Sequence, residues 1–383
     1  MSTVRLTPPP IQVDANDFTF KKWFQEVYQY SQGGVLIPTV DSTIQQYGGY
    51  RNLLINGSFQ INQRAANSYN NAAGTSFTVD RWAVGARAAN SYSVVYPVAG
   101  PPGFAQAVQV IRNVGDTSAA EIFFVNMSES KNSVVYAGKT IVLSFWLKCG
   151  TGFSGTPMVN SPNGETLESH VQSGTGTDEG ALAALTGGTF VVSGYIRPTT
   201  TWTYYQFSGT VPSNSNELKT YFGWTPAASA TTDDCIYLAG VQVEIARDQL
   251  NPIATAFEYI PFDVELARCK RYYQKSFAYG VVPGQNTLTL NGALVYQAVL
   301  AGIKGFTPMV YLPVAMRQNV SPTYYNYGAS NGKWRNFSLS TDSGSPTTSS
   351  QGPQSFGVLN PQVAADAQGN FMVIHWSCET ELI

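Results

Sequence analysis

The sequence predicts a mainly β chain, with a β-sandwich at its centre, a smaller β domain after it and an N-terminal arm with a short helix before it. Many short segments alternate apolar and polar side chains and end at Gly, Pro or Asn, which is typical of strands. No regular alternation of strands with long helices competes with that pattern. With 383 residues, of which 43% are hydrophobic, the chain is long enough for two cores and an extension.

Residues 1–50 are predicted to form an extended arm followed by one helix. The proline run at 7–10 favours extended backbone, because proline fixes φ and removes a hydrogen-bond donor. Asn16 or Asp17 is predicted to cap the helix, and Gly33 and Gly34 to end it. The helix carries one apolar stripe at helical spacing, made of Phe20, Trp23, Phe24, Val27 and Tyr30.

That stripe needs a partner, because so short a helix is marginal alone in water. Two alternatives stay open. The stripe packs against the β domain of its own chain, or it attaches the arm to copies of itself or to a socket in a larger assembly.

The first β segments are predicted at 52–61 and 78–84. In the second of them Asp80 and Trp82 share one side and Arg81 takes the other, because successive strand residues face opposite ways. Trp82 is assigned to the core, since an aromatic residue on an alternating strand is more often buried than exposed.

The remaining strands of the sandwich follow the same alternation. They are predicted at 91–112 (two strands joined by a tight turn), 121–126, 140–149, 189–195, 202–211, 219–224 and 235–245. The strand at 140–149 is the most apolar and is expected in the middle of a sheet. Its Leu143, Phe145 and Leu147 share one face, and Trp146 lies on the other but is also assigned to the core.

The rest of the chain is divided into a loop, a connector and a second β unit. Residues 150–188 are rich in Gly, Ser, Thr and Asn and are predicted to form a long loop. Residues 263–275 are predicted to be a helical connector. A smaller β domain follows at 276–383, with strands expected within 288–303, 309–316 and 371–376.

Composition argues against several classes of function. Charged residues make up 12% of the chain and the formal charge is -2, without a basic run, which argues against binding to nucleic acid. No apolar run reaches the ~18 residues needed to cross a bilayer, and no signal peptide is seen, so synthesis in a cytoplasm without membrane insertion is expected. The four cysteines are scattered and predict buried free thiols, not a zinc site or disulfide framework: Cys149, Cys235, Cys269 and Cys378.

No arrangement of residues predicts catalysis. A glycosidase would need two carboxylates flanking a sugar bond. The candidates are Glu165, Glu168, Asp178, Glu179, Asp233 and Asp234, and spacing ties none of them to a partner. His170 and His375 show no metal-binding or triad pattern. The sequence therefore predicts a protein that is not an enzyme and has no catalytic residue and no cofactor.

Two segments carry a resemblance to a known family. The run NLLINGSFQINQR at 52–64, followed by FTVDRW at 77–82, resembles the start of a β-jelly-roll module common in the fibre and tail proteins of tailed bacteriophages. It is similar, more distantly, to carbohydrate-binding modules. Residues 238–261 look like the closing strand of that module, and 265–273 with the terminal WSCETEL look like the segment that follows it.

The resemblance implies a structural virion fibre, of the tail or the head, with a jelly roll at 51–262 as its body. It also implies a homotrimer, made in the host cytoplasm and located in the virion, whose N-terminal region attaches to tail, collar or capsid proteins. Binding of a host-surface glycan or receptor is expected. Two alternatives remain: a polysaccharide depolymerase tailspike, and a purely structural capsid or collar decoration protein.

Carbohydrate-binding modules of this pattern often hold a calcium ion. Asn56, Ser58 and Asp234 fall at comparable places, but Gln60 stands where an acidic ligand is expected. No metal site is therefore predicted.

Exposed aromatic rings beside amide and charged groups are the candidate glycan-binding residues. In the jelly roll these are Tyr204 and Trp224, for which core packing is the open alternative. In the C-terminal domain the preferred contact surface is a loop cluster, with subunit packing as its alternative: Tyr324, Tyr325, Tyr327, Trp334 and Arg335.

Overall fold

The computed structural model confirms a mainly β protein and divides the chain into two compact units, residues 1–50 and residues 51–383. It describes residues 50–66, 68–71, 74–88, 92–153, 166–180, 184–227, 229–298 and 308–382. The predicted attachment residues of the helix, Phe20, Trp23, Phe24, Val27 and Tyr30, lie outside this part. None of the helices in the described ranges is long and apolar enough to span a bilayer.

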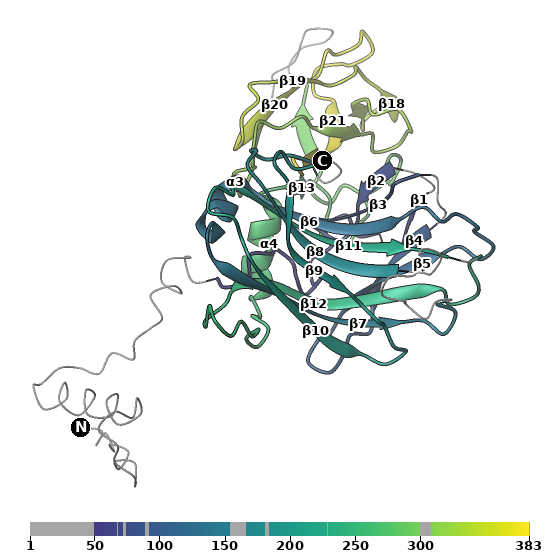
Figure 1. Ribbon diagram of the computed structural model, residues 1–383. Helices are drawn as coiled ribbons and strands as arrows, with labels where there is room; N and C mark the ends of the chain where they lie inside the picture. Colours follow the sequence, from purple (N-terminus) through teal and green to yellow (C-terminus); the bar gives the residue numbers. More distant parts are fainter. Residues whose placement is uncertain are drawn as a thin grey trace, which may run out of the picture. The chain divides into compact units, whose positions relative to one another are not determined.

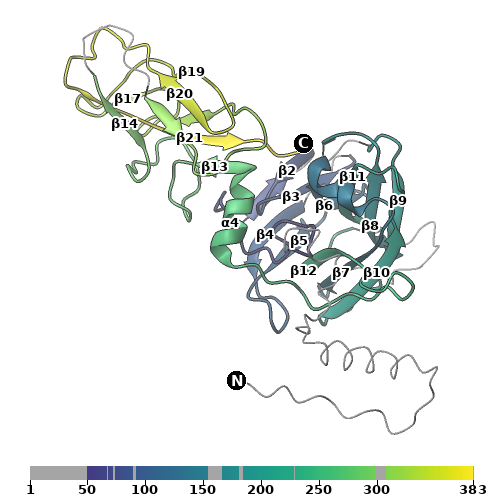
Figure 2. The same ribbon diagram turned by 90° about the vertical axis from the view of Figure 1, so that its left-hand side faces the viewer.

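Two six-stranded antiparallel sheets form the sandwich (Figure 1). The first sheet consists, in order, of β1 (Ser68–Asn71), β4 (Tyr92–Val98), β5 (Ala107–Arg112), β12 (Cys235–Ile245), β7 (Thr140–Cys149) and β10 (Thr203–Thr210). The second consists of β2 (Gly74–Phe77), β3 (Trp82–Ala86), β6 (Ile122–Ser128), β11 (Glu217–Thr225), β8 (Thr166–Gly174) and β9 (Thr189–Tyr195). Figure 2 shows the two sheets as separate layers.

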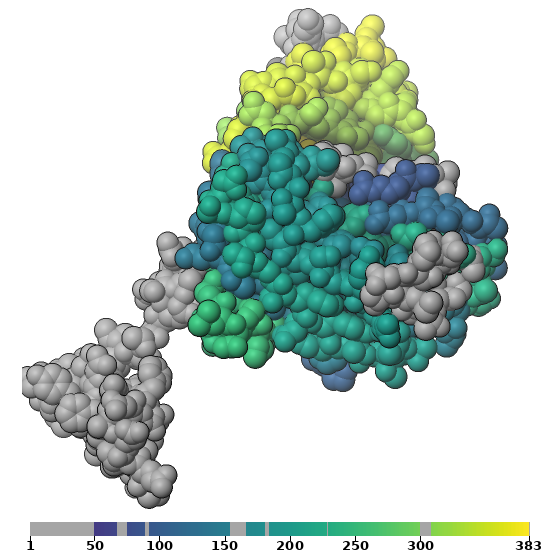
Figure 3. Space-filling view, in the orientation of Figure 1, coloured from purple at the N-terminus to yellow at the C-terminus, as the bar shows by residue number. Residues whose placement is uncertain are grey.

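The main core lies between these layers. Alternate residues of β7 from Ile141 to Leu147 join it, and Trp82 of β3 is fully buried in it, as predicted. β7 has a partner on each side, β12 and β10, which fits its apolar sequence. On the side seen in Figure 3, the sandwich surface is formed mainly by teal segments from the middle of the chain.

Two predictions near the start of the sandwich are wrong. Residues 52–61 form turns and irregular backbone, and β3 begins only at Trp82. Asn56 and Arg81 adopt left-handed φ values of 62° and 71°, which a strand does not contain. The side-chain amide of Asn56 donates to the carbonyls of Ile61 and Asp80, so it holds the two turns together.

The predicted long loop at 150–188 is also interrupted, because β8 runs through it. Its polar sequence hides the alternation, yet Leu167 and Val171 reach the core. Between β6 and β7 the chain makes a short helix, α3 (Ser130–Ser133), and a 3-10 turn, η1 (Val134–Tyr136).

The helix α4 (Phe262–Lys270) leads into the C-terminal sheets. One sheet contains β13 (Tyr273–Lys275), β21 (Phe371–Glu379), β17 (Arg335–Asn336) and β18 (Thr341–Asp342), with β14 (Leu294–Gln297) and β16 (Thr323–Tyr325) also paired to β21. The other contains β15 (Met309–Tyr311), β20 (Ser355–Leu359) and β19 (Thr347–Ser349). A second core packs between them, around Trp334, Phe356 and Trp376. All four cysteines are buried free thiols, as predicted.

Charged side chains join the sandwich to the segment that follows α4. Arg271 donates two hydrogen bonds, of 2.7 and 2.8 Å, to the carboxylate of Glu129 beside α3. Burial by itself would raise the pKa of Glu129, but the bonds from Arg271 outweigh burial and hold that pKa below the ordinary 4.5.

The pair predicts an acid-dependent stability. Because the folded-state pKa of Glu129 is lowered, its contribution is fully present above the ordinary value of 4.5 and is lost as pH falls through the folded value. The Tm difference between the wild type and Glu129→Gln is expected to be constant near neutral pH and to shrink as the pH falls below the ordinary value of 4.5. Calorimetry across that range measures it, and a constant difference would contradict the assignment.

Candidate functional site

The outer face of the first sheet carries an aromatic pair. On β7, Phe145 points into the core, so its neighbours Ser144 and Trp146 point outward. Tyr204 of β10 lies opposite Trp146 in register, and their ring centroids are 5.4 Å apart. Tyr204 is 42% exposed, so the pair presents aromatic surface to solvent.

A second pair of aromatic side chains, Phe104 and Phe257, lies on the other side of β12. The strand has an irregularity between Ala239 and Gln242, where Gly240 takes a φ of 57°. A Cβ at Gly240 would lie 2.4 Å from the ring of Phe104, so glycine is what lets that ring rest on the strand. Phe104 packs edge-on against Phe257 at 5.0 Å, and this contact joins the β4–β5 turn to the segment after β12.

Sheet side chains hold that segment in place. The Gln206 side-chain oxygen accepts from the Ala254 N–H at 3.0 Å, and the Glu244 carboxylate accepts from the Thr255 N–H at 2.6 Å. Because Glu244 is 2% exposed and bonded in this way, its role is to position the backbone.

These elements enclose an open groove of about 420 Å³, called here the aromatic groove. Its lining residues are Phe104, Ser144, Trp146, Tyr204, Gly240, Thr255, Ala256 and Phe257. None of these described lining residues carries a charge. The groove therefore offers ring faces together with the hydroxyl of Tyr204, while the hydroxyl of Thr255 is bonded to Glu244 and Arg51.

The Tyr204 hydroxyl is available as a neutral hydrogen-bonding group. Burial raises its pKa above the ordinary value of 10, and the hydrogen bond with Ser144 only partly opposes that shift. The phenol therefore stays protonated at neutral pH and can both donate and accept.

Of the two jelly-roll residues predicted to bind a ligand, the structure exposes one. Tyr204 lines the aromatic groove, whereas Trp224 is 1% exposed and stacks on Phe153 in the core. The prediction for Trp224 is wrong because Phe222 and Trp224, two residues apart, both point inward from β11. Trp224 is therefore a core residue, which was the open alternative.

The predicted C-terminal cluster is not one exposed loop. Trp334 is fully buried, with its ring edge-on to Tyr296 at 5.1 Å, so it has no face for a ligand. Tyr324 packs against the same core, and its hydroxyl bonds to Thr348. The reason is strand pairing, since β16 and β17 both add to β21 and carry alternate residues inward.

The other three members of the cluster point to different neighbours. Arg335 forms an ion pair with Asp342 at 2.9 Å. The ring of Tyr327 packs against Phe337 at 5.5 Å. Tyr325 is half-buried and lines a separate pocket. The five residues thus do not form one binding surface.

Trp146, Phe104 and Phe257 belong to the groove, although Trp146 was predicted to be a core residue and the other two were not identified from the sequence. The alternation of β7 already placed Trp146 opposite the apolar face, and that signal should have outweighed its assignment to the core. Phe104 and Phe257 are about 150 residues apart in the chain. Nothing in their local sequence indicates that they meet.

The candidate carboxylates make local contacts away from the groove. Glu168 bonds His170 at 2.7 Å, Asp233 accepts from Thr151, and Asp234 pairs with Arg112 at 2.8 Å. Asp178 accepts from Ser130, and Glu179 accepts from Thr186. Glu165 lies outside the described residues.

The calcium-like positions are also separated. Asp234 is paired with Arg112, while Asn56 is held by the carbonyls of Ile61 and Asp80. Within the described ranges, no group of three or more His, Cys, Asp or Glu residues could hold a metal ion.

Neither a protein-family model nor a curated protein sequence matches this chain. Among solved structures, a CBM4 structure is similar with 17% identity, covering 50% of this chain and 97% of its own, at a TM-score of 0.29. The enzymatically active domain of bacteriophage CBA120 tailspike protein 4 has 15% identity, covering 51% of this chain and 22% of its own, at 0.30. A family 16 carbohydrate-binding module has 15% identity, covering 50% of this chain and 99% of its own, at 0.27. Identities and TM-scores this low assign no chemistry to the groove. What the groove can bind therefore follows only from its own side chains.

Proposed function

We propose that this chain is a non-enzymatic fibre protein of a virion that binds an uncharged glycan in the aromatic groove. The observation that carries the proposal is the uncharged groove itself, in which Trp146 and Tyr204 face solvent together and hydroxyls stand beside the rings.

Sugars suit such a surface for a simple reason. A pyranose ring has C–H groups that pack on aromatic faces and hydroxyls around its edge that need oriented partners. Trp146 and Tyr204 supply the faces, and the half-exposed Tyr204 supplies a hydroxyl beside them. The Thr255 hydroxyl is already bonded to Glu244 and Arg51. The lack of charge among the described lining residues favours a neutral glycan over an acidic one.

The groove supports binding more than hydrolysis. Cleavage of a glycosidic bond by the common route uses two carboxylates on either side of the bond. Among the described residues that line the groove there is no Asp or Glu, and the nearby Glu244 is occupied by Thr255.

The virion setting rests on the sequence resemblance at 52–64, 77–82, 238–261 and 265–273 and in the terminal WSCETEL. In this proposal residues 1–50 attach the protein to tail, collar or capsid, and the sandwich forms the body of a homotrimer. The glycan belongs to the host surface, and the protein resides in the virion.

The binding test compares single variants on an array of neutral and acidic glycans, followed by titration calorimetry with the best neutral ligand. Trp146→Ala and Tyr204→Ala are each expected to weaken binding about tenfold. Burying roughly 60 Å² of ring surface contributes about 1.5 kcal/mol, and 1.4 kcal/mol corresponds to a factor of ten. Tyr204→Phe keeps the ring and is expected to lose less. Tyr195→Ala is the matched control, because Tyr195 is 48% exposed but lies on β9 of the other sheet.

Three outcomes would contradict the proposal. Binding that survives both alanine variants would place the glycan elsewhere. Release of new reducing ends from a bound polysaccharide would make the protein a depolymerase. Binding to no glycan, together with no retention on host cells, would leave a purely structural decoration protein.

A further inference from the structure

The aromatic groove has two walls of different chemistry. On one side Trp146 and Tyr204 present ring surface together with an indole N–H and a hydroxyl group. On the other side Phe104 and Phe257 present hydrocarbon alone. Both walls border the same groove of about 420 Å³, so a ligand that fills it contacts both. Such a ligand needs one polar side and one apolar side.

The apolar wall is held in place by a third ring. The ring centroids of Phe104 and Phe257 are 5.0 Å apart. The ring of Tyr259 lies 5.5 Å from that of Phe104 and 5.2 Å from that of Phe257. The hydroxyl of Tyr259 donates to the carbonyl of Gly103, in the turn that carries Phe104. Three rings in mutual contact fix one another, so the wall keeps its apolar surface toward the groove.

The hydroxyls of the described lining residues are not available on that side. Ser144 is 3% exposed, and the hydroxyl of Thr255 is already bonded within the protein. The backbone carbonyl of Ala256 accepts from Arg51 at 3.2 Å. The hydroxyl of Tyr204, which is 42% exposed, belongs to the opposite wall. A sugar hydroxyl turned toward the two phenylalanines would therefore lose its hydrogen bonds with water and gain none from these groups.

A 6-deoxyhexose has the polarity that this arrangement requires. Its sixth carbon is a methyl group, where an ordinary hexose carries a hydroxymethyl group. The methyl group projects from the edge of the sugar, so it contacts the phenylalanines while the C–H face of the ring packs on Trp146. An acetylated sugar also carries a methyl group, but its amide or ester adds polar atoms that need partners. The groove thus favours the 6-deoxyhexose.

We propose that the aromatic groove selects a 6-deoxyhexose residue of the glycan, with the methyl group of the sugar against Phe104 and Phe257. The inference rests on the proposed function and names the class of sugar bound at the same site. Phe104 and Phe257 determine the specificity, whereas Trp146 and Tyr204 hold the ring of any hexose that enters.

The test compares matched pairs of free sugars that differ by a single hydroxyl group. The pairs are D-fucose with D-galactose, 6-deoxy-D-glucose with D-glucose, L-fucose with L-galactose, and L-rhamnose with L-mannose. Titration of the full chain, followed by saturation-transfer NMR, is expected to show binding of at least one 6-deoxyhexose. That sugar should bind about tenfold more tightly than its hydroxylated partner. An apolar site rejects an added hydroxyl group by up to roughly a hundredfold, so this preference is of the expected size.

Three variants locate the preference on one wall. Phe257→Ala opens the apolar wall to water, so the 6-deoxyhexose is expected to bind no more tightly than its hydroxylated partner. Phe257→Leu keeps an apolar side chain and is the matched control, in which the preference is expected to remain. Trp146→Ala removes the ring face that both sugars use. It is expected to weaken both members of a pair about tenfold and to leave their ratio unchanged.

Equal affinities within every pair, or tighter binding of the hydroxylated sugar, would overturn the proposal. So would a preference that survives in Phe257→Ala, binding of N-acetylated hexoses alone, or no binding of any 6-deoxyhexose. If Phe257→Ala lowers Tm strongly, the pairs measured on the wild type and on Phe257→Leu decide the proposal. The glycan array decides the proposed function separately, because a neutral ligand that depends on Trp146 and Tyr204 supports it whichever sugar is preferred.

Discussion

Replacing Glu381 by glutamine is expected to lower the free energy of unfolding by about 3–5 kcal/mol, the usual result of removing one partner from a buried ion pair. The Glu381 side chain is 1% exposed and pairs with Arg81, which is 2% exposed. It also lies 3.5 Å from Arg64. Without its charge, two buried guanidinium groups lose their shared counter-ion. Urea unfolding at neutral pH, followed by tryptophan fluorescence, measures the change.

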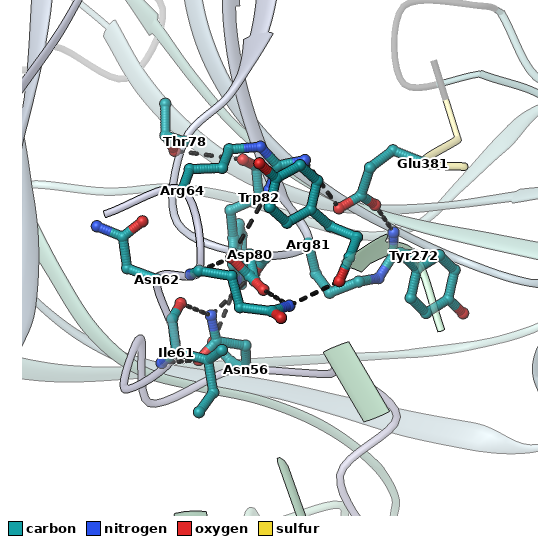
Figure 4. A network of polar contacts seen from close by, with 12 residues as sticks. Asn56, Ile61, Asn62, Arg64, Thr78, Asp80, Arg81, Trp82, Tyr272 and Glu381 are labelled. Atoms are coloured by element: carbon teal, nitrogen blue, oxygen red, sulfur yellow. Dashed lines mark hydrogen bonds and ion pairs between the residues drawn. The ribbon is translucent and has the colours of Figure 1, made fainter. Parts of the chain in front are cut away.

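The effect should be large because, among the described residues, Glu381 is the only carboxylate that pairs with Arg81. Arg81 has a φ of 71° in the turn before β3, and its side chain reaches the C-terminal segment at Glu381. There the guanidinium lies 3.5 Å from the centre of the Tyr272 ring (Figure 4). It also donates to the carbonyl of Met127.

Two controls separate this charge effect from a general sensitivity of the segment. Glu379→Gln changes a side chain that is 40% exposed and is expected to cost less than about 1 kcal/mol. The double variant Arg81→Met with Glu381→Met is expected to be more stable than the sum of the single changes predicts, because it leaves no unpaired charge at this pair. Additive losses would contradict the assigned pairing.

Replacing Trp82 by alanine is expected to cost about 3–5 kcal/mol, as for other large aromatic residues cut back in a core. Trp82 is fully buried and stacks on Phe124 at 4.8 Å, with Phe59 at 5.1 Å on another side. Its indole N–H donates to the carbonyl of Asn56 at 3.0 Å. Loss of the ring therefore leaves a cavity and frees the turn segment at 52–62.

The variant Trp82→Phe separates these two contributions. It keeps an aromatic ring in the core but removes the bond to Asn56, so a smaller loss is expected than for alanine. Chemical unfolding of the two variants measures both. An alanine variant that loses less than about 1 kcal/mol would show that the Trp82 site is not tightly packed.

Strands with clean alternation could be predicted from the sequence almost to the residue. β7, β9 and β12 begin and end where apolar periodicity placed them. The prediction of a strand at 52–61 was wrong although Leu54, Phe59 and Ile61 are all buried, because turns and not a pleated strand bring these side chains into the core. Short windows of alternating apolar residues do not distinguish these two ways of reaching a core.

The candidate site could be predicted only in part, because it joins distant segments. Tyr204 was identified as a possible ligand contact, and the β7 pattern placed Trp146 on the same side. The contact of Phe104 with Phe257 depends on a glycine in β12, Gly240, that lets the ring of Phe104 approach the strand closely. Trp224 and Trp334 were wrongly predicted as possible contacts, because composition shows that an aromatic residue is present but not which way its side chain faces.

β21 also sets an order of events during synthesis. It is the strand to which β13, β14, β16 and β17 all pair, and it is made after every one of them. The strands of the sandwich all precede residue 246, so they can associate while the ribosome is still translating the rest. The C-terminal sheet can form only after β21 has been synthesised. Arg64 and Arg81 pair with the carboxylate of Glu381 only in that step. Until then the nascent chain keeps two cationic side chains and four unpaired strand edges available to chaperones or to other nascent copies.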